Sequence, residues 1–247
     1  MNVKTVSVYG YGRFGRFWAE ILAEDFRVKV YSRRGLNKNE ISDKVEITDF
    51  KGLFEADAVF YCVSISSFEE VLKLSGKYAR PETIFFDTCS VKVNPVKWMK
   101  TNLPVNSQVI ATHPMFGPDS YFNTRSDLPM VMCNITAANE IFNWWVDYFG
   151  NKKMRTEIMT PDQHDEIVAY SQGITHYVGR VLADLNLSST KINTLGYIKL
   201  LEIIEQTCND SWQLFIDLQR FNPYTQKMRV DLFESVEKIY KALNDKK

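Results

Sequence analysis

The chain has 247 residues, which is long enough for one large or two modest domains with well-buried cores. Its 30 Lys and Arg residues balance 30 Asp and Glu residues, so no global electrostatic field favours nucleic acid or an anionic membrane surface. This balance excludes neither class strictly, but it favours a small-molecule ligand.

The first part of the chain alternates short β-rich runs with helical patterns. Strands are expected at Thr5–Tyr9, Val28–Tyr31, Ala58–Val63, Thr83–Asp87, Gln108–Thr112, Met130–Ile135 and Lys153–Ile158. Helices are expected between them at Phe14–Ala23, Phe68–Ala79, Pro95–Lys100 and Asn139–Phe149. Ser67 and Glu70 have the spacing of a capping box at the start of the second helix. The alternation predicts an α/β fold whose mostly parallel sheet is covered on both faces.

The pattern becomes helical after Ile158. Thr160, Pro161 and Gln163 have the spacing of a cap, a first-turn proline and an N3 residue at the head of a long helix. Breaks in the helical period follow at Leu187–Lys191, Asn209 and Asn222-Pro223. We therefore expect an α/β domain over residues 1–158 and an all-helical domain over residues 159–247.

A glycine-rich turn separates the first strand from the first helix and reads Gly10-Tyr11-Gly12-Arg13-Phe14-Gly15. Between a strand and a helix, this spacing is typical of the Rossmann-type dinucleotide site. Its glycines allow a tight turn, close approach of the pyrophosphate and close helix packing, and the helix N-terminus favours phosphate. The alternative, an ordinary strand–helix turn, is less compatible with all three glycines.

The end of the second strand indicates which nucleotide binds. An acidic residue, which would bind the ribose hydroxyls of NAD, is absent there; the chain has Ser32, Arg33 and Arg34 instead. A hydroxyl and two guanidinium groups suit a 2′-phosphate, so the predicted cofactor is NADP. A solvated basic turn is the alternative.

Three further loops follow predicted parallel strands and are expected at the same sheet edge. Val63 and Ser64 follow the third strand and could line the ribose and nicotinamide side of the cofactor. Ser90 and His113 follow the next two strands. The imidazole of His113 could accept a hydroxyl proton as hydride leaves the same carbon, and Ser90 could orient either the imidazole or the substrate. The alternatives are a structural histidine and a turn or cap hydroxyl.

The helical part carries a polar stripe on an otherwise apolar helix. Gln172, His176 and Arg180 are spaced four residues apart and share roughly one face. The stripe suits either a carboxylated polar ligand or a hydrogen-bond network between helices or subunits. His164, in the first turn of this helix, is expected to cap or pack.

Other sequence features favour a cytoplasmic protein without metal. The four cysteines are widely spaced and form no metal-ligand cluster, so we expect free thiols. We see no leader pattern at the N-terminus and no run of the roughly 20 apolar residues that a membrane span needs.

Three motifs together resemble the prephenate/arogenate dehydrogenases of tyrosine biosynthesis. They are the glycine turn, Asp87-Thr88-Cys89-Ser90-Val91-Lys92 and His113-Pro114-Met115-Phe116-Gly117-Pro118. The helical segments HDEIVAYSQGITHYVGRVL, STKINTLGY and NDSWQLF resemble the plant-type arogenate dehydrogenases. The resemblance runs in order over nearly the whole chain.

The resemblance implies an NADP-binding Rossmann domain, a helical substrate and dimerisation domain, and a homodimer. It also implies oxidative decarboxylation, in which hydride passes to NADP⁺ and the ring carboxylate leaves as CO₂. His113 would take the hydroxyl proton, and Ser90 would hydrogen-bond near His113, substrate and nicotinamide. An arginine for a substrate carboxylate is left open among Arg180, Arg220 and Arg229.

Asp210 bears on the choice between arogenate and prephenate. The resemblance places an acidic residue here in plant-type arogenate dehydrogenases, where it could pair with the arogenate ammonium. Its alternative role is an N-cap for the helix that starts at Ser211. Arogenate is the expected substrate, with prephenate as the alternative. The competing classes are a β-hydroxyacid dehydrogenase or imine reductase, and an NADP-responsive binding protein without turnover.

Overall fold

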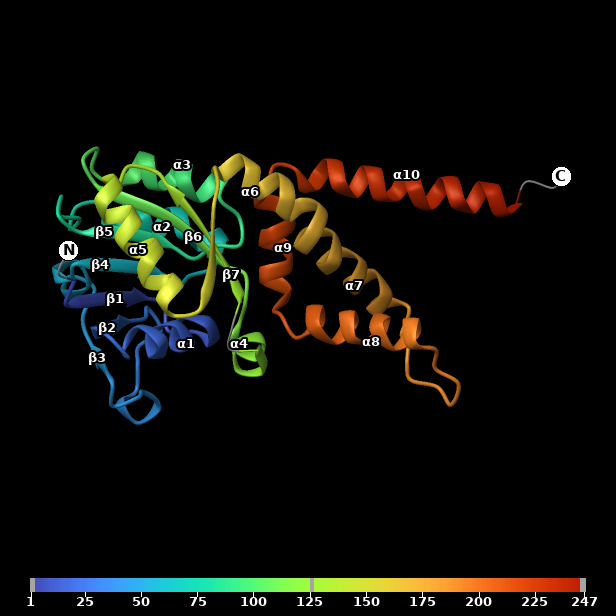
Figure 1. The fold of residues 1–247 in the computed structure, drawn as a ribbon, viewed down its shortest axis with the longest axis horizontal. Helices are drawn as coiled ribbons and strands as arrows, with labels where there is room; N and C mark the ends of the chain where they lie inside the picture. Colours follow the sequence, from blue (N-terminus) through green and yellow to red (C-terminus); the bar gives the residue numbers. More distant parts are fainter. Residues whose placement is uncertain (1–2, 125–126, 245–247) are drawn as a thin grey trace. The chain divides into compact units, whose positions relative to one another are not determined.

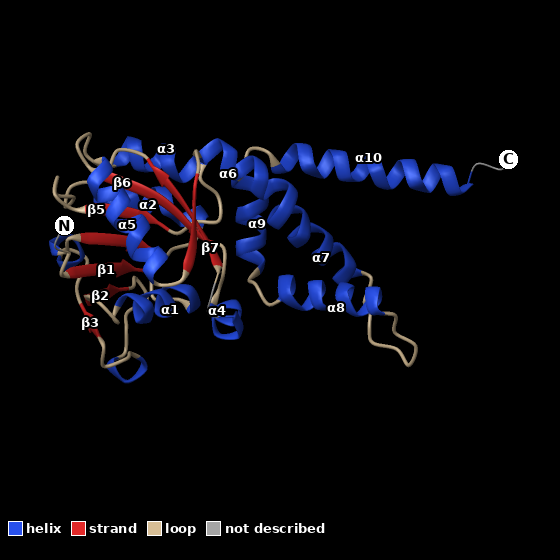
Figure 2. Cartoon of the chain, viewed as in Figure 1, coloured by secondary structure: helices blue, strands red, loops and turns tan. Residues whose placement is uncertain are grey.

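The computed structural model describes residues 3–124 and 127–244 and contains two compact units, residues 1–162 and 163–247 (Figure 1). The first unit holds the strands and the second is helical (Figure 2). The change from strands to helices therefore falls close to Ile158. The ligands that the sequence assigns to each part remain predictions.

The first unit is built on one eight-stranded sheet with the order β3-β2-β1-β4-β5-β6-β7-β8. The strands are β1 (Thr5–Tyr9), β2 (Arg27–Tyr31), β3 (Val45–Ile47), β4 (Ala58–Tyr61), β5 (Ile84–Asp87), β6 (Gln108–Pro114), β7 (Leu128–Asn134) and β8 (Met154–Ile158). All neighbours are parallel except β6 and β7. The predicted α/β class with a mostly parallel sheet is confirmed. The short edge strand β3 was not predicted.

Helices connect the strands and cover the sheet (Figures 1 and 2). They are α1 (Arg13–Leu22), α2 (Ile65–Ser75), α3 (Val93–Asn102), α4 (Pro118–Thr124) and α5 (Asn139–Asn151), with 3₁₀ turns η1 (Lys38–Glu40) and η2 (Gly52–Glu55). The predicted capping box in α2 is wrong. The helix begins at Ile65, whose side chain is buried, and Ser64 precedes it as N-cap residue. The Ser64 hydroxyl instead donates to the Ser67 hydroxyl at 2.8 Å.

Aromatic side chains dominate the core between the sheet and two of its helices. Phe60 on β4 and Phe86 on β5 stack with ring centroids 4.3 Å apart, and Trp145 of α5 meets Phe86 at 4.8 Å. Trp18 of α1 is fully buried and contacts Phe60. Each such side chain contributes roughly 1.5–3 kcal/mol by burial. This packing holds the middle strands, and so their carboxyl ends, in a fixed arrangement.

The second unit consists of helices joined by short breaks. They are α6 (Pro161–Val168), the π-helical turn η3 (Ala169–Gly173), α7 (Ile174–Asp184), α8 (Leu195–Cys208), α9 (Trp212–Phe221) and α10 (Thr225–Asn244). The predicted breaks are present. The long helix after Thr160 differs from the prediction, because η3 interrupts it. The Gln219 side chain donates to the Gly173 carbonyl at 2.8 Å and so satisfies an acceptor in this widened turn.

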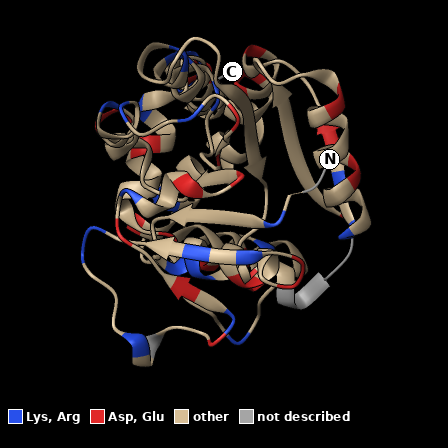
Figure 3. Ribbon diagram, turned by 90° about the vertical axis from the view of Figure 1, so that its left-hand side faces the viewer, with Lys and Arg blue, Asp and Glu red and all other residues tan. Residues whose placement is uncertain are grey.

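Charged residues of both signs are interspersed along the ribbon in Figure 3, in keeping with the balanced composition. Within the described ranges, no helix is long and apolar enough to cross a membrane.

Candidate active site

Four predicted site segments follow four adjacent strands. The strands β1, β4, β5 and β6 are neighbours and parallel, so their carboxyl ends share one edge of the sheet. Gly10 follows β1, Val63 and Ser64 follow β4, Ser90 follows β5, and His113 lies at the end of β6. In open α/β sheets this edge is where ligands bind.

Two of the three glycines in the turn leave no room for a side chain, and the third lies beside open space. Gly10 has a φ of +100°, and a Cβ there would lie 2.2 Å from the Cys62 carbonyl oxygen. A Cβ on Gly15 would lie 2.0 Å from the Gly10 carbonyl oxygen. At Gly12, the N-cap of α1, a Cβ would meet nothing within 4 Å. The turn therefore needs Gly10 and Gly15 for its own packing, while the open space at Gly12 fits a pyrophosphate.

The larger side chains of the turn contact the protein. Phe14 stacks on Trp18 with ring centroids 5.7 Å apart, and Arg13 forms an ion pair with Asp119 of α4. Burial raises the pKa of the Tyr11 hydroxyl. The backbone of this turn, more than its side chains, suits a cofactor.

Ser32, Arg33 and Arg34 lie directly after β2, as predicted. The Ser32 hydroxyl accepts a hydrogen bond from the Arg34 N–H at 3.4 Å. Arg33 Nη1 lies 4.0 Å from Glu70 Oε2 of α2, and both side chains are largely exposed. Sequence reasoning missed Glu70 as a partner of Arg33, because nothing local connects two residues on different elements.

Ser90 and His113 are both buried, with 8% and 4% of their surface exposed. Within the described part of the chain, the Ser90 hydroxyl has no hydrogen-bond partner. His113 lies on β6, opposite Val131 of the antiparallel strand β7. The pairing with β7 therefore fixes the backbone that carries the imidazole.

A buried ion pair that sequence reasoning missed lies beside these two residues. Asp87, the last residue of β5, pairs with Lys92, and neither side chain is exposed to solvent. Lys92 Nζ donates to the Thr112 carbonyl oxygen at 2.5 Å, and Thr112 N–H donates to Asp87 Oδ1 at 3.1 Å. Burial raises the pKa of Asp87, while Lys92 and the N–H groups of Cys89 and Thr112 act in the opposite direction. Lys92 belongs to the motif that carries the family resemblance, but no role was predicted for it.

The helical unit brings together three of its four predicted residues. His176 Nε2 lies 3.8 Å from Asp210 Oδ2. Arg180 Nη2 donates to the carbonyl oxygens of Thr207 and Asp210, at 3.0 Å and 2.6 Å. A Cβ at Gly179 would lie 2.2 Å from the Thr207 hydroxyl, so this glycine lets α7 and α8 approach closely.

Burial is the main influence on the imidazole of this cluster. Burial lowers the pKa of His176, while the Asp210 carboxylate raises it and Arg180 lowers it. Asp210 is not an N-cap: the Ser211 hydroxyl accepts the Leu214 N–H and caps α9. The carboxylate of Asp210 therefore keeps capacity for a ligand.

Each residue of the predicted polar stripe has a buried polar atom without a partner. Gln172 Oε1, His176 Nδ1 and Arg180 Nε have no hydrogen-bond partner among the described residues. Buried polar groups normally have a partner, so a polar ligand would satisfy these atoms. Arg180 also supports the alternative of an interhelical network through its bonds to α8 and to the α8–α9 connection. The two roles are compatible, because different nitrogen atoms serve them.

Two other titratable candidates of the helical unit bond to protein groups, and the third is exposed. His164 is buried, and its Nδ1 lies 2.7 Å from Asp165 Oδ1. Arg229 Nη1 bonds to the Gln219 carbonyl and side-chain oxygens, and Arg220 is exposed. Of the three arginines left open, Arg180 is the one in contact with the Asp210 segment.

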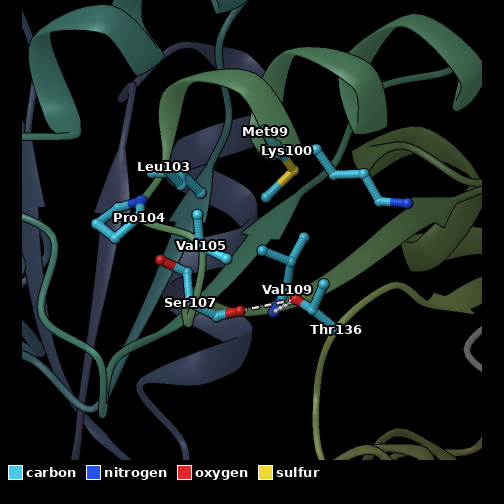
Figure 4. Close-up of a pocket in the computed structure, with 8 residues that line it drawn as sticks. All are labelled: Met99, Lys100, Leu103, Pro104, Val105, Ser107, Val109 and Thr136. Atoms are coloured by element: carbon cyan, nitrogen blue, oxygen red, sulfur yellow. Dashed lines mark hydrogen bonds between the residues drawn. The ribbon is translucent and has the colours of Figure 1, made fainter.

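A separate hollow lies between the end of α3 and the start of β6 (Figure 4). Its lining is mainly apolar, with Met99, Leu103 and Val109, and Lys100 is the one charged residue among those described there. Val109 is at the amino end of β6, whereas His113 is near its carboxyl end. This hollow is therefore not part of the candidate site.

The chain is similar to known proteins over both of its units. Residues 31–131 match the family model "Prephenate dehydrogenase, nucleotide-binding domain", and residues 181–247 match "TYRAAT1-like, C-terminal domain". Arogenate dehydrogenase 1, chloroplastic, of Arabidopsis thaliana is 34% identical over 228 residues, with 88% of this chain but 36% of the relative covered. Arogenate dehydrogenase 2, chloroplastic, of the same plant is 32% identical over 247 residues, with 94% and 69% covered.

The fold has a solved counterpart. Prephenate dehydrogenase from A. aeolicus, in complex with hydroxyphenyl propionate and NAD⁺, superposes with a TM-score of 0.76. The alignment covers 98% of this chain and 91% of that structure at 17% identity, which supports the fold alone. The extended similarity to the second Arabidopsis protein, together with the matching nucleotide-binding domain, shows that this chain belongs to the prephenate/arogenate dehydrogenase family.

Proposed function

We propose that the chain is an NADP-dependent dehydrogenase that converts arogenate to tyrosine by oxidative decarboxylation. The observation that carries this proposal is the presence of the glycine turn, Ser90 and His113 on adjacent strand ends of one sheet edge. The names of the Arabidopsis relatives support arogenate as the substrate class. The chain spans 36% and 69% of those two proteins, so their activity is transferred here as a proposal.

When bound, NADP⁺ would supply the hydride acceptor for the ring carbon that bears the hydroxyl. His113 takes the hydroxyl proton as this carbon is oxidised. Loss of the ring carboxylate as CO₂ leaves a phenolate oxygen, to which His113 can return the proton. The Ser90 hydroxyl, which has no partner among the described residues, would orient the substrate hydroxyl or the imidazole. Atoms balance, since arogenate and NADP⁺ give tyrosine, CO₂ and NADPH.

The choice of NADP rests on Ser32, Arg33 and Arg34. Guanidinium groups form charge-assisted hydrogen bonds with a phosphate, and the segment after β2 offers no carboxylate for the ribose hydroxyls of NAD. Val63 lies against Gly10, and Ser64 is the N-cap residue of α2, so both lie next to the glycine turn or at a helix start and suit the ribose and nicotinamide side of the same cofactor.

The choice of arogenate rests on Asp210. Its carboxylate is free of a capping role and lies 3.8 Å from His176, whose pKa is lowered mainly by burial, so it suits an ammonium group. Arg180 would donate its Nε–H to the neighbouring carboxylate, whereas Gln172 Oε1 and His176 Nδ1 would accept hydrogen bonds from donor groups of the substrate; all three atoms lack partners among the described residues. Prephenate, which lacks the ammonium group, is the second candidate.

The homodimer also belongs to this proposal. Helix α10 exposes Phe233, Val236, Tyr240 and Leu243, spaced three to four residues apart on one face. A second copy of this chain would cover that face, as the family resemblance implies. The predicted cytoplasmic location stays a prediction, since the two Arabidopsis relatives are named as chloroplastic.

An absorbance assay for NADPH formation tests the proposal. Purified chain is incubated with NADP⁺ or NAD⁺ and with arogenate, prephenate or simple hydroxy acids. We expect turnover with arogenate and NADP⁺ to exceed every other combination. Turnover with hydroxy acids alone would place the chain with the β-hydroxyacid dehydrogenases. Cofactor binding without turnover of any substrate would favour a binding protein.

A further inference from the structure

We propose that Asp87 and Lys92 are positioning residues, whose buried ion pair is fastened to Thr112 and thereby fixes Ser90 relative to His113. This inference rests on the proposed function, because it assigns these residues to the same reaction. We call the three residues Asp87, Lys92 and Thr112 the clamp.

Three hydrogen bonds connect the β5 loop with the end of β6. Thr112 N–H donates to Asp87 Oδ1 at 3.1 Å, and the Thr112 hydroxyl donates to the Asp87 carbonyl oxygen at 2.5 Å. Lys92 Nζ donates to the Thr112 carbonyl oxygen at 2.5 Å. The backbone and side chain of Thr112 are thus held from both ends of the loop.

The two catalytic candidates are next to this clamp. His113 directly follows Thr112, so the fastened carbonyl oxygen belongs to the peptide unit that leads into the histidine. Ser90 lies between Asp87 and Lys92, and the Cys89 N–H donates to Asp87 Oδ2 at 3.1 Å. Neither segment can shift without breaking bonds that are buried from water.

The energetics favour a geometric role over a stabilising one. Removing two charges from water is costly, and apolar residues of similar volume often stabilise a core equally well or better. Asp87 and Lys92 are fully buried, so their pair bears that cost. A displacement of about 1 Å at reacting groups can lower a rate roughly hundredfold. The clamp is therefore more valuable for placement than for folding.

Two substitutions test the clamp at different strength. Thr112→Val removes one hydrogen bond and keeps both charges, whereas Lys92→Met removes the ammonium group. The matched control is Lys152→Met, because Lys152 is 17% exposed and pairs with Glu24 and Asp25. We expect kcat to fall about tenfold in the first variant and about hundredfold in the second. The dissociation constant of NADPH should stay within about twofold in both.

A merely structural role has a different signature. If kcat falls only in proportion to the fraction of chain that still binds NADPH, the clamp supports folding and the proposal is overturned. Unchanged kcat in Thr112→Val and Lys92→Met also overturns it. Misplacement should in addition increase the primary deuterium isotope effect with substrate labelled at the oxidised ring carbon. Should Lys92→Met not fold, Thr112→Val alone decides.

A readout without turnover separates this proposal from the proposed function. The chain has three histidines, so their imidazole signals can be assigned by NMR. Thr112→Val should shift the signal of His113 and leave those of His164 and His176 unchanged. An unshifted His113 signal would contradict the clamp even if the wild-type chain is active. Failure of the wild type to oxidise arogenate or prephenate would count against the proposed function alone.

Discussion

Arg33 and Glu70 are in contact at the proposed cofactor site, and substituting one or the other should change NADP⁺ affinity in opposite directions. Arg33→Ala removes a guanidinium group proposed to bind the 2′-phosphate. A hydrogen bond to a charged group contributes about 1.5–3 kcal/mol, and the lower half of that range applies because Arg33 is half-exposed. We therefore expect about 10- to 30-fold weaker binding of NADP⁺. NAD⁺, which lacks the 2′-phosphate, should change by less than about threefold.

Glu70→Gln should act in the other direction. The Glu70 carboxylate lies 4.0 Å from Arg33 and would compete for it with the proposed 2′-phosphate. Two unit charges at this distance interact by about 1 kcal/mol in water, and exposure reduces that figure further. NADP⁺ should therefore bind about two- to fivefold more tightly in the variant.

The assay compares kcat/KM for NADP⁺ and for NAD⁺ with arogenate held saturating, at low and at high salt. Arg27→Ala is the matched control, because it removes a positive charge at the opposite end of β2, where Arg27 pairs with Glu46. It should leave the cofactor ratio unchanged. Equal losses for both cofactors in Arg33→Ala would refute the 2′-phosphate assignment.

Four further predictions address the remaining proposals. His113→Asn should lower kcat by at least about a hundredfold, because the proton acceptor is lost, with NADPH affinity within about twofold by fluorescence titration. Asp210→Asn should shift the ratio of kcat/KM for arogenate to that for prephenate towards prephenate by about tenfold or more; an unaltered ratio would deny Asp210 a role in selection. Burial lowers the pKa of His176, so the folded chain binds fewer protons than the unfolded chain as pH falls below about 6.5, and stability decreases across that window. His176→Gln should reduce this loss in urea unfolding at pH 7.5 and pH 5, and an identical loss would contradict it. Phe233→Glu on the exposed face of α10 should convert a dimer to a monomer in light scattering, whereas a monomeric wild type would refute the homodimer.

Local sequence patterns were sufficient to predict most strands and helices of the first unit. Strand and helix periods gave the parallel sheet, and the glycine spacing gave the turn after β1. Misses arose where the local signal was short or absent. Strand β3 has three residues, too few to show alternation. Helix α2 begins at Ile65, after Ser64, and therefore earlier than the capping-box spacing at Ser67 predicted.

Long-range contacts account for what the sequence did not predict at the site. Lys92 and Thr112 are 20 residues apart in the chain, and the pair of Arg33 with Glu70 joins two different elements. No spacing rule connects such residues. The two roles predicted for Asp210, an N-cap and a partner for ammonium, differ in a local contact. The Ser211 hydroxyl caps α9, so the Asp210 carboxylate is available for a ligand.

Different residues are proposed to control the rate and the choice of substrate, and variants can test this division. The pairing of β6 with β7 holds the backbone of His113, and the clamp connects it to the loop that carries Ser90, so changes there should alter kcat whichever substrate is offered. Asp210 and His176 are charged or titratable groups of the helical unit and should alter the ratio between substrates. A double variant of Thr112→Val with Asp210→Asn should therefore show additive effects on kcat and on the ratio. Strong non-additivity would mean that the clamp also controls which substrate is accepted.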